Sequence, residues 1–381
     1  MRFLTAGESH GQKLVGIIEG LPSGMRISQD LVDQALKKRQ QGPGRGGRMA
    51  IEQDKVHFLS GVRGGCSTGA PLAMEILNRD WENWEKIMAW GEDADLESRK
   101  VLTPRPGHAD LTGALKYRTE VRNILERASA RETAMRVAIG SVVRQGLSQL
   151  GVEIRGRVLA VGGIQAPLSD DEDYWERVRQ SEWSVGDPDA ERKMGEQLLA
   201  ARELGESLGG TLEVQVLHLP AGLGSHVQWD RKLDGKLAQA VLSIQAIKGV
   251  SFGLGFDAGA KMGSQVHDPI EYTQGQGYHR ASNHAGGIEG GMSNGEPLVL
   301  QAVMKPIPTL YRPLNTVHLE TKETVKASVE RSDICAVPAA LVVLEHVVAW
   351  VIAEAVLEKF PADSFTELET AWEKYKEYLK L

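Results

Sequence analysis

A basic stretch at residues 37–48 places cationic side chains among closely spaced glycines and contains no acidic residue. An arginine guanidinium forms paired hydrogen bonds to phosphate or carboxylate groups, and glycines let the backbone approach a ligand closely. The stretch therefore predicts a site for a multiply anionic ligand, with a solvated basic loop as the alternative. Its cations are Lys37, Lys38, Arg39, Arg45 and Arg48.

Two histidines lie in short segments that have no apolar periodicity. His108 follows a Pro-Gly pair beside Arg105, and His10 lies between small residues in the segment 7–11. An imidazole titrates near neutral pH, so a histidine on a constrained loop is a candidate general acid. Taken singly, each histidine is better explained as an ordinary loop residue.

Three further segments suit an anionic ligand. Arg127 and Arg131 flank the predicted start of a helix, where free amides and the helix dipole favour an anion. A glycine-dense loop covers residues 283–295, a Lys-Pro-Ile-Pro-Thr segment covers 305–309, and Arg331 precedes an apolar run. Together these segments predict a wall that holds a ligand, and simple turns are the alternative.

Composition limits the classes of protein to consider. The 381-residue chain carries 44 Lys and Arg against 51 Asp and Glu, a net charge of −7, which argues against general binding of nucleic acid or anionic membranes. Cys66 and Cys335 are far apart and have no metal-binding spacing, so we expect free thiols in a reducing compartment and no metal. The N-terminus lacks a secretory signal pattern, and the apolar run 337–353 is interrupted by charge. We therefore expect a cytoplasmic protein in which this run is a buried helix.

Periodicity predicts several helices. Ser28 and Asp230 are expected as N-caps, and Ser129 with Glu132 as a capping box. The helices are expected at residues 28–40, 129–150, 230–246, 338–358 and 365–380.

The strand-like runs do not alternate regularly with the helices. This order favours a mixed α+β fold over a doubly wound parallel sheet. We expect a single domain over residues 1–381, with surface excursions at 78–98 and 165–207 that contribute no chemistry. The clearest strand-like runs are 15–18, 72–76, 211–217 and 298–304.

Seven segments together resemble the chorismate synthase family, and the resemblance runs from residue 1 to about residue 360. They are TAGESHG at 5–11, RQQGPGRGGRM at 39–49, RPGHAD at 105–110, RASARETA at 127–134, IQAIKGV at 244–250, NHAGGIEGGMSNG at 283–295 and ERSDICAVPAA at 330–340.

This resemblance implies a carbon–oxygen lyase of the shikimate pathway of aromatic amino acid biosynthesis. The reaction converts 5-enolpyruvylshikimate 3-phosphate to chorismate and phosphate by a 1,4-anti elimination, and it requires reduced FMN without net redox change. The implied fold is a β-α-β sandwich, with central helices between antiparallel sheets. The implied assembly is a homotetramer.

The resemblance also implies roles for individual residues. His108 would be the acid that assists the departing phosphate, and His10 the proton partner of the reduced flavin. Asp333 would help to remove the C6 hydrogen. The implied substrate-binding residues are Arg39, Arg45, Arg48, Arg105 and Arg131. The implied flavin contacts are Arg127, Ala128, Ser129, Gln245, Ala246, Gly290, Lys305, Pro306, Ile307, Pro308, Thr309 and Arg331.

The chain departs from the family pattern at a few of these positions. Ser332 stands where family members often have histidine, and Ala128 stands where serine is usual. Ile307 and Pro308 replace a hydroxyl-bearing segment, so we expect a looser hold on the flavin there.

Two other functions share part of this pattern. A flavin-dependent oxidoreductase acting on a phosphorylated anionic metabolite would use the flavin loops, and a non-enzymatic phospholigand-binding module would need only the arginines. The joint presence of His10, His108 and Asp333 favours the lyase.

The source of reducing power is a separate question. Gly42, Gly44 and Gly47 match the dinucleotide-binding spacing, but that motif needs a preceding strand and a helix is predicted there. We therefore expect NADPH to act only indirectly, through a separate flavin reductase.

Overall fold

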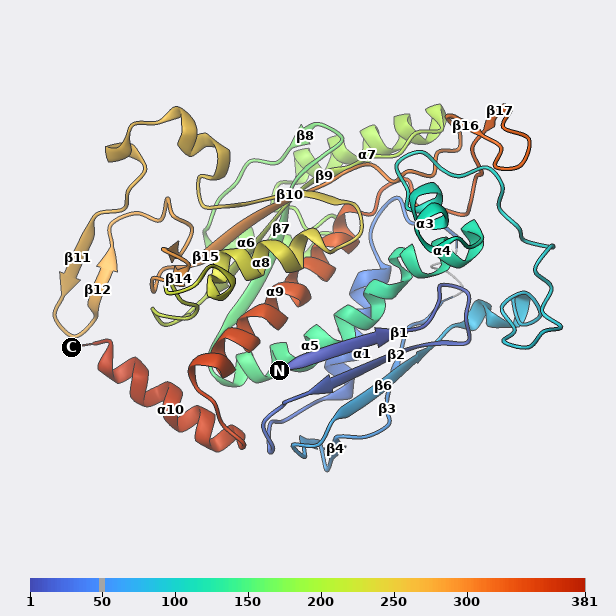
Figure 1. The fold of residues 1–381 in the computed structure, drawn as a ribbon. Helices are drawn as coiled ribbons and strands as arrows, with labels where there is room; N and C mark the ends of the chain where they lie inside the picture. The colour runs from blue at the N-terminus through green and yellow to red at the C-terminus, as the bar shows by residue number, and fades with distance from the viewer. Residues whose placement is uncertain (48–51, 381) are drawn as a thin grey trace.

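The computed structural model describes residues 1–47 and 52–380, so Arg48 lies outside the described residues. Within them, the two largest sheets are antiparallel throughout (Figure 1). The first has the order β1-β2-β6-β3, formed by Arg2–Ala6, Lys13–Glu19, Leu72–Leu77 and Val56–Phe58. The second has the order β10-β15-β9-β7-β8, formed by Ile247–Phe252, Leu298–Met304, Gly210–Leu217, Glu153–Val161 and Ile164–Gln165.

Helices α5 (Thr133–Gln149) and α9 (Val337–Lys359) pack between these sheets. Helix α5 covers the first sheet, where a Cβ at Gly16 would lie 2.5 Å from the Met135 sulfur. Helix α9 covers the second sheet, where a Cβ at Gly156 would lie 2.7 Å from Leu341. Because glycine has no side chain, each helix packs close against its sheet at these two positions.

The apolar run predicted as a buried helix is α9. It is long and apolar enough to cross a membrane, but 89% of its most apolar window is buried inside the protein. Helix α1 (Gln29–Gln40) packs on both α5 and α9 and buries Val32 and Leu36. These helices and the facing sides of the two sheets contribute to a common core.

The predicted helices and strands are all present. Ser28 is the N-cap residue of α1 as predicted, but the predicted helix starts at Ser129 and Asp230 are wrong. The Ser28 side chain makes no capping bond, and its backbone N–H instead donates to Gln145 at 2.7 Å. Ser129 accepts from the Arg131 amide and begins a 3-10 turn, Ala130–Glu132, that precedes α5. Asp230 lies in another such turn, and α8 (Leu233–Leu242) begins after it. Tertiary hydrogen bonds take the groups that a local cap would use.

The two predicted excursions are less peripheral than expected. Residues 165–207 form α6 (Glu172–Gln180) and α7 (Pro188–Leu204), and they bury Trp183 and Met194 in the common core. Residues 78–98 are mostly irregular, yet they carry the buried Trp84 to the His10 ring. This segment therefore reaches a candidate catalytic residue, contrary to the expectation.

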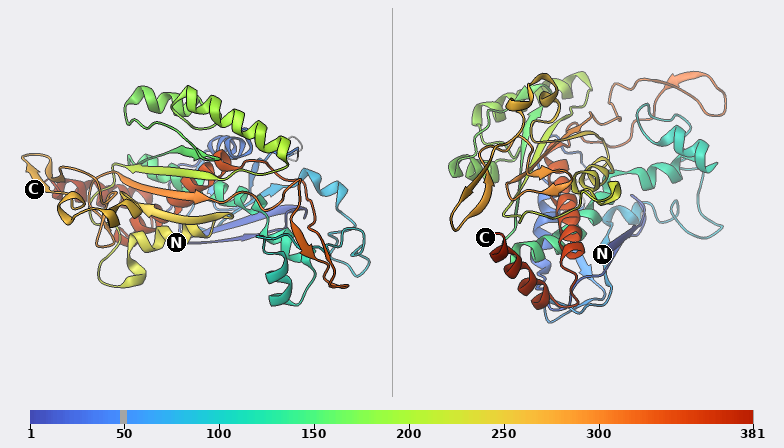
Figure 2. Two further views of the ribbon diagram at one scale, coloured as in Figure 1. Left: turned by 90° about the horizontal axis from the view of Figure 1, so that it is seen from above. Right: turned by 60° about the vertical axis from the view of Figure 1, so that its left-hand side comes forward.

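Most of the remaining elements lie toward the two ends of the molecule, whereas β4 (Val62–Arg63) lies below the first sheet in Figure 1. Figure 1 shows β11, β12 and α10 at one end and α3, α4, β16 and β17 at the other, and Figure 2 shows the same separation from two more directions. These elements are β4 (Val62–Arg63), β5 (Cys66–Ser67), α3 (Asp110–Tyr117), α4 (Val121–Ala128), β11 (Ile270–Thr273), β12 (Gly277–Arg280), β13 (Ile288–Glu289), β14 (Met292–Ser293), β16 (Asn315–Val317), β17 (Thr324–Lys326) and α10 (Phe365–Tyr378).

Gly140→Ala tests the close approach of α5 and α9. An added Cβ would lie 2.5 Å from the His346 Cβ, against the neighbouring helix, so the helices must separate. We expect the free energy of unfolding to fall by about 1–3 kcal/mol, measured by urea denaturation.

Gly195→Ala in α7 is the matched control, because nothing lies within 4 Å of its added Cβ. Alanine forms helix better than glycine, so this variant should be neutral or more stable by about 0.5–1 kcal/mol. Equal stability of the two variants would contradict the close approach at Gly140.

Candidate active site

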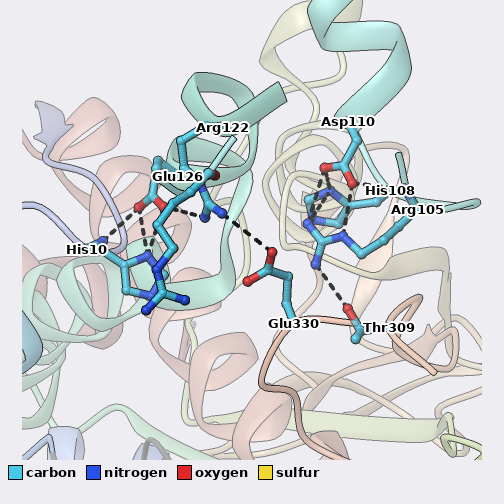
Figure 3. A network of polar contacts seen from close by, with 9 residues as sticks. His10, Arg105, His108, Asp110, Arg122, Glu126, Thr309 and Glu330 are labelled. Atoms are coloured by element: carbon cyan, nitrogen blue, oxygen red, sulfur yellow. Dashed lines mark hydrogen bonds and ion pairs between the residues drawn. The ribbon is translucent and has the colours of Figure 1, made fainter. Parts of the chain in front are cut away.

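The His108 loop is fixed by a buried carboxylate at the start of α3. Asp110 accepts hydrogen bonds from the Arg105 backbone N–H at 3.0 Å and from Arg105 Nε at 2.9 Å. The same carboxylate lies 2.5 Å from His108 Nδ1 (Figure 3). Burial raises the pKa of Asp110, but the hydrogen bonds from His108 and Arg105 outweigh it and hold that pKa well below its usual range. Asp110 therefore stays charged and holds the side chains of both Arg105 and His108.

The predicted flavin-contacting segment 305–309 packs on this loop. Arg105 Nη1 donates to Thr309 Oγ1 at 3.0 Å, and the Lys305 ammonium donates to the Gly107 carbonyl. Burial, with the nearby Lys248, lowers the pKa of Lys305. The structure thus brings Lys305 and Thr309 to His108, as the sequence-based assignment to one site requires.

His10 lies in the loop between β1 and β2, and α4 holds it. Glu126 accepts from the His10 backbone N–H at 2.8 Å, and its carboxylate oxygens lie 2.8 and 3.0 Å from His10 Nδ1. Trp84 stacks on the imidazole with ring centroids 3.9 Å apart and planes inclined by 24°. Burial raises the pKa of Glu126, but the contacts with His10 and Arg122 lower it overall. The ring of His10 is therefore held both at its edge and on its face.

The corner between α4 and α5 gathers several predicted flavin contacts. Exposed Arg127 donates to the carbonyls of Thr5 and Gly7, and Ser129 accepts from the Ser9 hydroxyl at 3.1 Å. Ala128 lies between them at the end of α4.

Gln245 and Ala246 lie against the same corner. Gln245 Nε2 donates to Glu132 at 3.3 Å, while its Oε1 is buried without a hydrogen-bond partner among the described residues. Ala246 has φ of 67°, a backbone conformation that residues with side chains rarely adopt. Its carbonyl accepts from the Lys305 amide at 2.9 Å, which links this corner to the His108 loop.

Residues 330–333 connect the surroundings of His10 to the basic stretch. Glu330 lies 3.6 Å from Arg122, the partner of Glu126, and Figure 3 shows it between the two groups. Asp333 forms an ion pair with Arg45 at 2.5 Å and accepts from the Gly46 amide at 2.6 Å. Arg45 and Asp333 therefore come from distant parts of the chain to one place.

Arg39 and Arg131 are buried together, although both were expected to contact substrate. Their side chains are 5% and 2% exposed, and both bind Asp54, at 2.8 and 2.6 Å. Burial, opposed by Asp54, lowers the pKa of Arg39 to about 10. Their guanidinium groups lie inside the protein, so direct contact with substrate stays a prediction at these two positions.

Gly290 lies away from the other predicted flavin contacts, and Arg331 is exposed to solvent. Gly290 lies in the turn between β13 and β14. The carbonyl of the next residue, Gly291, accepts a hydrogen bond from the Leu233 amide, the first amide of α8. Gln245 follows the opposite end of that helix, so the structure does not bring Gly290 to the other candidates. Arg331 is exposed beside Ser332, and Pro306, Ile307 and Pro308 continue the segment after Lys305.

Sequence reasoning gave no role to Trp84, Glu126, Asp110 or Asp54. The only local signal is the spacing of Asp110, two residues after His108. Glu126 is 116 residues from His10, so only the fold brings them together. Likewise the contact of Trp84 with His10 has no counterpart in the sequence pattern.

Asp54→Asn tests the buried pair of arginines. The amide removes the buried carboxylate that both arginines bind and leaves Arg131 only its longer contact with Glu52, at 3.7 Å, so we expect a loss of about 3–5 kcal/mol in the free energy of unfolding. Asp189→Asn is the matched control, because Asp189 binds Arg192 and Lys193 on the exposed surface. Its urea midpoint should stay near that of the wild type. A comparable loss in both variants would show that burial of Asp54 has no special effect.

Comparison with known proteins places this geometry in a family. A sequence profile described as chorismate synthase matches residues 1–357. The chain is 69% identical over 379 residues to the chorismate synthase of Desulfitobacterium hafniense strain DSM 10664 / DCB-2, covering 100% of this chain and 99% of the relative. It is 54% identical over 384 residues to that of Desulforamulus reducens, with 100% and 99% covered.

A solved structure agrees with these relatives. A crystal structure of chorismate synthase superposes with a TM-score of 0.80 at 40% sequence identity, covering 100% of this chain and 98% of the other. The likeness extends over both sheets and the helices between them, so it includes every segment that carries a candidate site residue. The chain belongs to the chorismate synthase family.

Proposed function

We propose that this chain removes phosphate from 5-enolpyruvylshikimate 3-phosphate to give chorismate, at the site formed by His10, His108, Arg45, Arg105 and Asp333. The family match and the relatives at 53–69% identity support this carbon–oxygen lyase activity. One observation carries the location: two histidines and several cations from distant segments are linked by contacts through α4 and residues 305–333.

The substrate phosphate would bind beside the His108 loop. Arg105 and Lys305 bring two positive charges there, against the single carboxylate of Asp110. This local excess of positive charge suits an anion, although the whole chain is acidic. Arg45 would hold a substrate carboxylate from the other side, next to Asp333.

Three side chains of this site would each carry out one proton transfer of the reaction. Asp110 engages His108 at Nδ1, which leaves Nε2 as the nitrogen that gives a proton to the departing phosphate. His10 is held in the same way by Glu126 and would exchange a proton with the reduced cofactor at its Nε2. Asp333 would accept the hydrogen removed from C6 as a proton.

Reduced FMN is the cofactor that family membership implies, and it supplies electron density to the substrate when bound. The corner between α4 and α5 fits such a group, because the buried Gln245 Oε1 lacks a partner among the described residues and Ala246 adopts a strained conformation. We propose that the flavin contacts are Arg127, Ala128, Ser129, Gln245, Ala246, Lys305, Pro306, Ile307, Pro308, Thr309 and Arg331. Gly290 is the contact that this arrangement supports least.

Other properties follow from the same family membership as proposals. The two antiparallel sheets around α5 and α9 would form the β-α-β sandwich of the family, as one domain with Arg39, Arg48 and Arg131 near the substrate. The protein would be a cytoplasmic homotetramer. A separate flavin reductase would use NADPH to supply reduced FMN.

An anaerobic assay of phosphate release tests the proposed reaction directly. We expect release from 5-enolpyruvylshikimate 3-phosphate with dithionite-reduced FMN and none with oxidised FMN, because the family reaction needs the reduced form. Chorismate should appear in equal amount to phosphate. Release that does not depend on the state of the flavin would refute the proposal.

His108→Ala tests the proposed acid. Loss of general acid catalysis should lower kcat by about 10²-fold or more while the thermal midpoint stays near that of the wild type. His57→Ala is the control, because His57 is exposed on β3, and it should keep wild-type turnover. Equal rates in the two variants would remove His108 from the mechanism.

Arg45→Ala tests the basic stretch. Loss of a charge-assisted contact should raise KM for the phosphorylated substrate by about tenfold to a hundredfold. The exposed Arg192, which pairs with acids on its own helix, provides the control variant Arg192→Ala with an unchanged KM. An unchanged KM in Arg45→Ala would indicate that the basic stretch faces solvent during turnover.

A further inference from the structure

Both candidate catalytic histidines make the same kind of contact, although they lie in unrelated loops. Each presents Nδ1 to a carboxylate from a neighbouring short helix: His10 to Glu126 of α4, at 2.8 Å, and His108 to Asp110 of α3, at 2.5 Å. Both carboxylate side chains are fully buried, while the histidines are 15% and 16% exposed. Each acid therefore lies behind its histidine, away from solvent.

We propose that Glu126 and Asp110 are positioning residues that hold the imidazole rings of His10 and His108 by contact with Nδ1, so that each ring meets the reactants in a fixed orientation. This inference rests on the proposed function, since it assigns the partner of each histidine in that reaction. A carboxylate on one ring nitrogen selects the tautomer with hydrogen on that nitrogen and stabilises the imidazolium form. The same acid thus sets ring orientation and proton affinity together.

The contacts of Glu126 favour this role over a simple ion pair with Arg122. Glu126 meets His10 three times, through the backbone N–H and twice at Nδ1, all within 3.0 Å. Its hydrogen bond from Arg122 is longer, at 3.3 Å. Arg122 also reaches Glu330 and the Arg99 carbonyl, so it has partners besides Glu126.

Trp84 adds a second restraint that His10 alone receives. Its indole stacks on the imidazole, and its Nε1 donates to the buried Asp80 at 3.2 Å, which anchors the indole. The guanidinium groups of Arg99 and Arg122 lie 5.0 and 5.3 Å from the indole centre. Among the described residues, Glu126 is thus the charged group that contacts His10, and the guanidinium groups of Arg122 and Arg99 lie near the indole that stacks on it.

The surroundings of His108 are simpler. Asp110 contacts its Nδ1, and Arg105 Nη2 lies 3.1 Å from the same nitrogen. Lys305 approaches the loop through the Gly107 carbonyl. Because the Arg105 backbone N–H and Nε both donate to one oxygen of Asp110, the single amide oxygen of its asparagine variant can accept both bonds while the charge is lost.

The variants Glu126→Gln and Asp110→Asn test the proposal, each serving as the control for the other. The readout is exchange of the imidazole C2 hydrogen, followed over a pH series by mass spectrometry of the peptides that contain His10 and His108. Loss of the carboxylate charge destabilises the imidazolium, so the pH of half-maximal exchange should move to lower pH by about 0.5–1 unit at the partner histidine. The other histidine should not shift.

Turnover distinguishes failure of this inference from failure of the proposed function. We expect each variant to lower kcat by about tenfold to a hundredfold with little change in KM, and Glu126→Gln to cost nothing further in a His10→Gln background. A shifted exchange curve with normal kcat would support the positioning contact and refute the proposed role of the histidine. An unshifted curve would overturn the positioning proposal, whatever happens to kcat.

Folding is checked separately by the thermal midpoint of each variant. Should Glu126→Gln fail to fold, Asp110→Asn carries the same test at the other histidine. Failure of its exchange curve to shift would then overturn the proposal.

Discussion

The candidate active site depends on carboxylates that hold cations in place from inside the protein. Asp54 binds Arg39 and Arg131, Asp110 binds Arg105 and His108, Glu126 binds His10 and Arg122, and Asp333 binds Arg45. Burial by itself would neutralise such acids, yet the pKa of Asp54, Asp110 and Glu126 is lowered. Contact with the arginines and histidines outweighs desolvation at all three, so these acids stay charged although they are buried.

This arrangement reconciles an acidic chain with an anionic substrate. A net charge of −7 would repel a phosphorylated dicarboxylate if the charges were spread evenly. Asp110 and Glu126 are instead fully buried, while the histidines that they bind keep some exposure. A ligand thus meets cationic groups first, and the acids behind them restrict the positions of those groups.

The sequence alone predicts the parts of this structure whose signals are local. Apolar periodicity locates α1, α5, α8, α9 and α10, and alternation locates β2, β6, β9 and β15. Strands β1 and β7 were not predicted, and β7 pairs with β9 only across the intervening helices α6 and α7. The same limit applies to the site: the motifs identify His10 and His108, but Glu126 becomes relevant only when α4 packs on the β1–β2 loop. The burial of Arg39 could not be predicted for the same reason, because Asp54 and Arg131 come close to it only when the chain is folded.

The two acids that hold the histidines lie at opposite ends of their helices, so the helix dipoles act on their negative charges in opposite ways. Asp110 is the first residue of α3, where the helix dipole stabilises an anion even without His108. Glu126 lies in the last turn of α4, where the dipole opposes a negative charge. Glu126 must therefore draw its stabilisation from Arg122 and from the N–H groups of His10. Its charge and the position of His10 depend on each other, which explains why this histidine has the additional support of Trp84 and His108 does not.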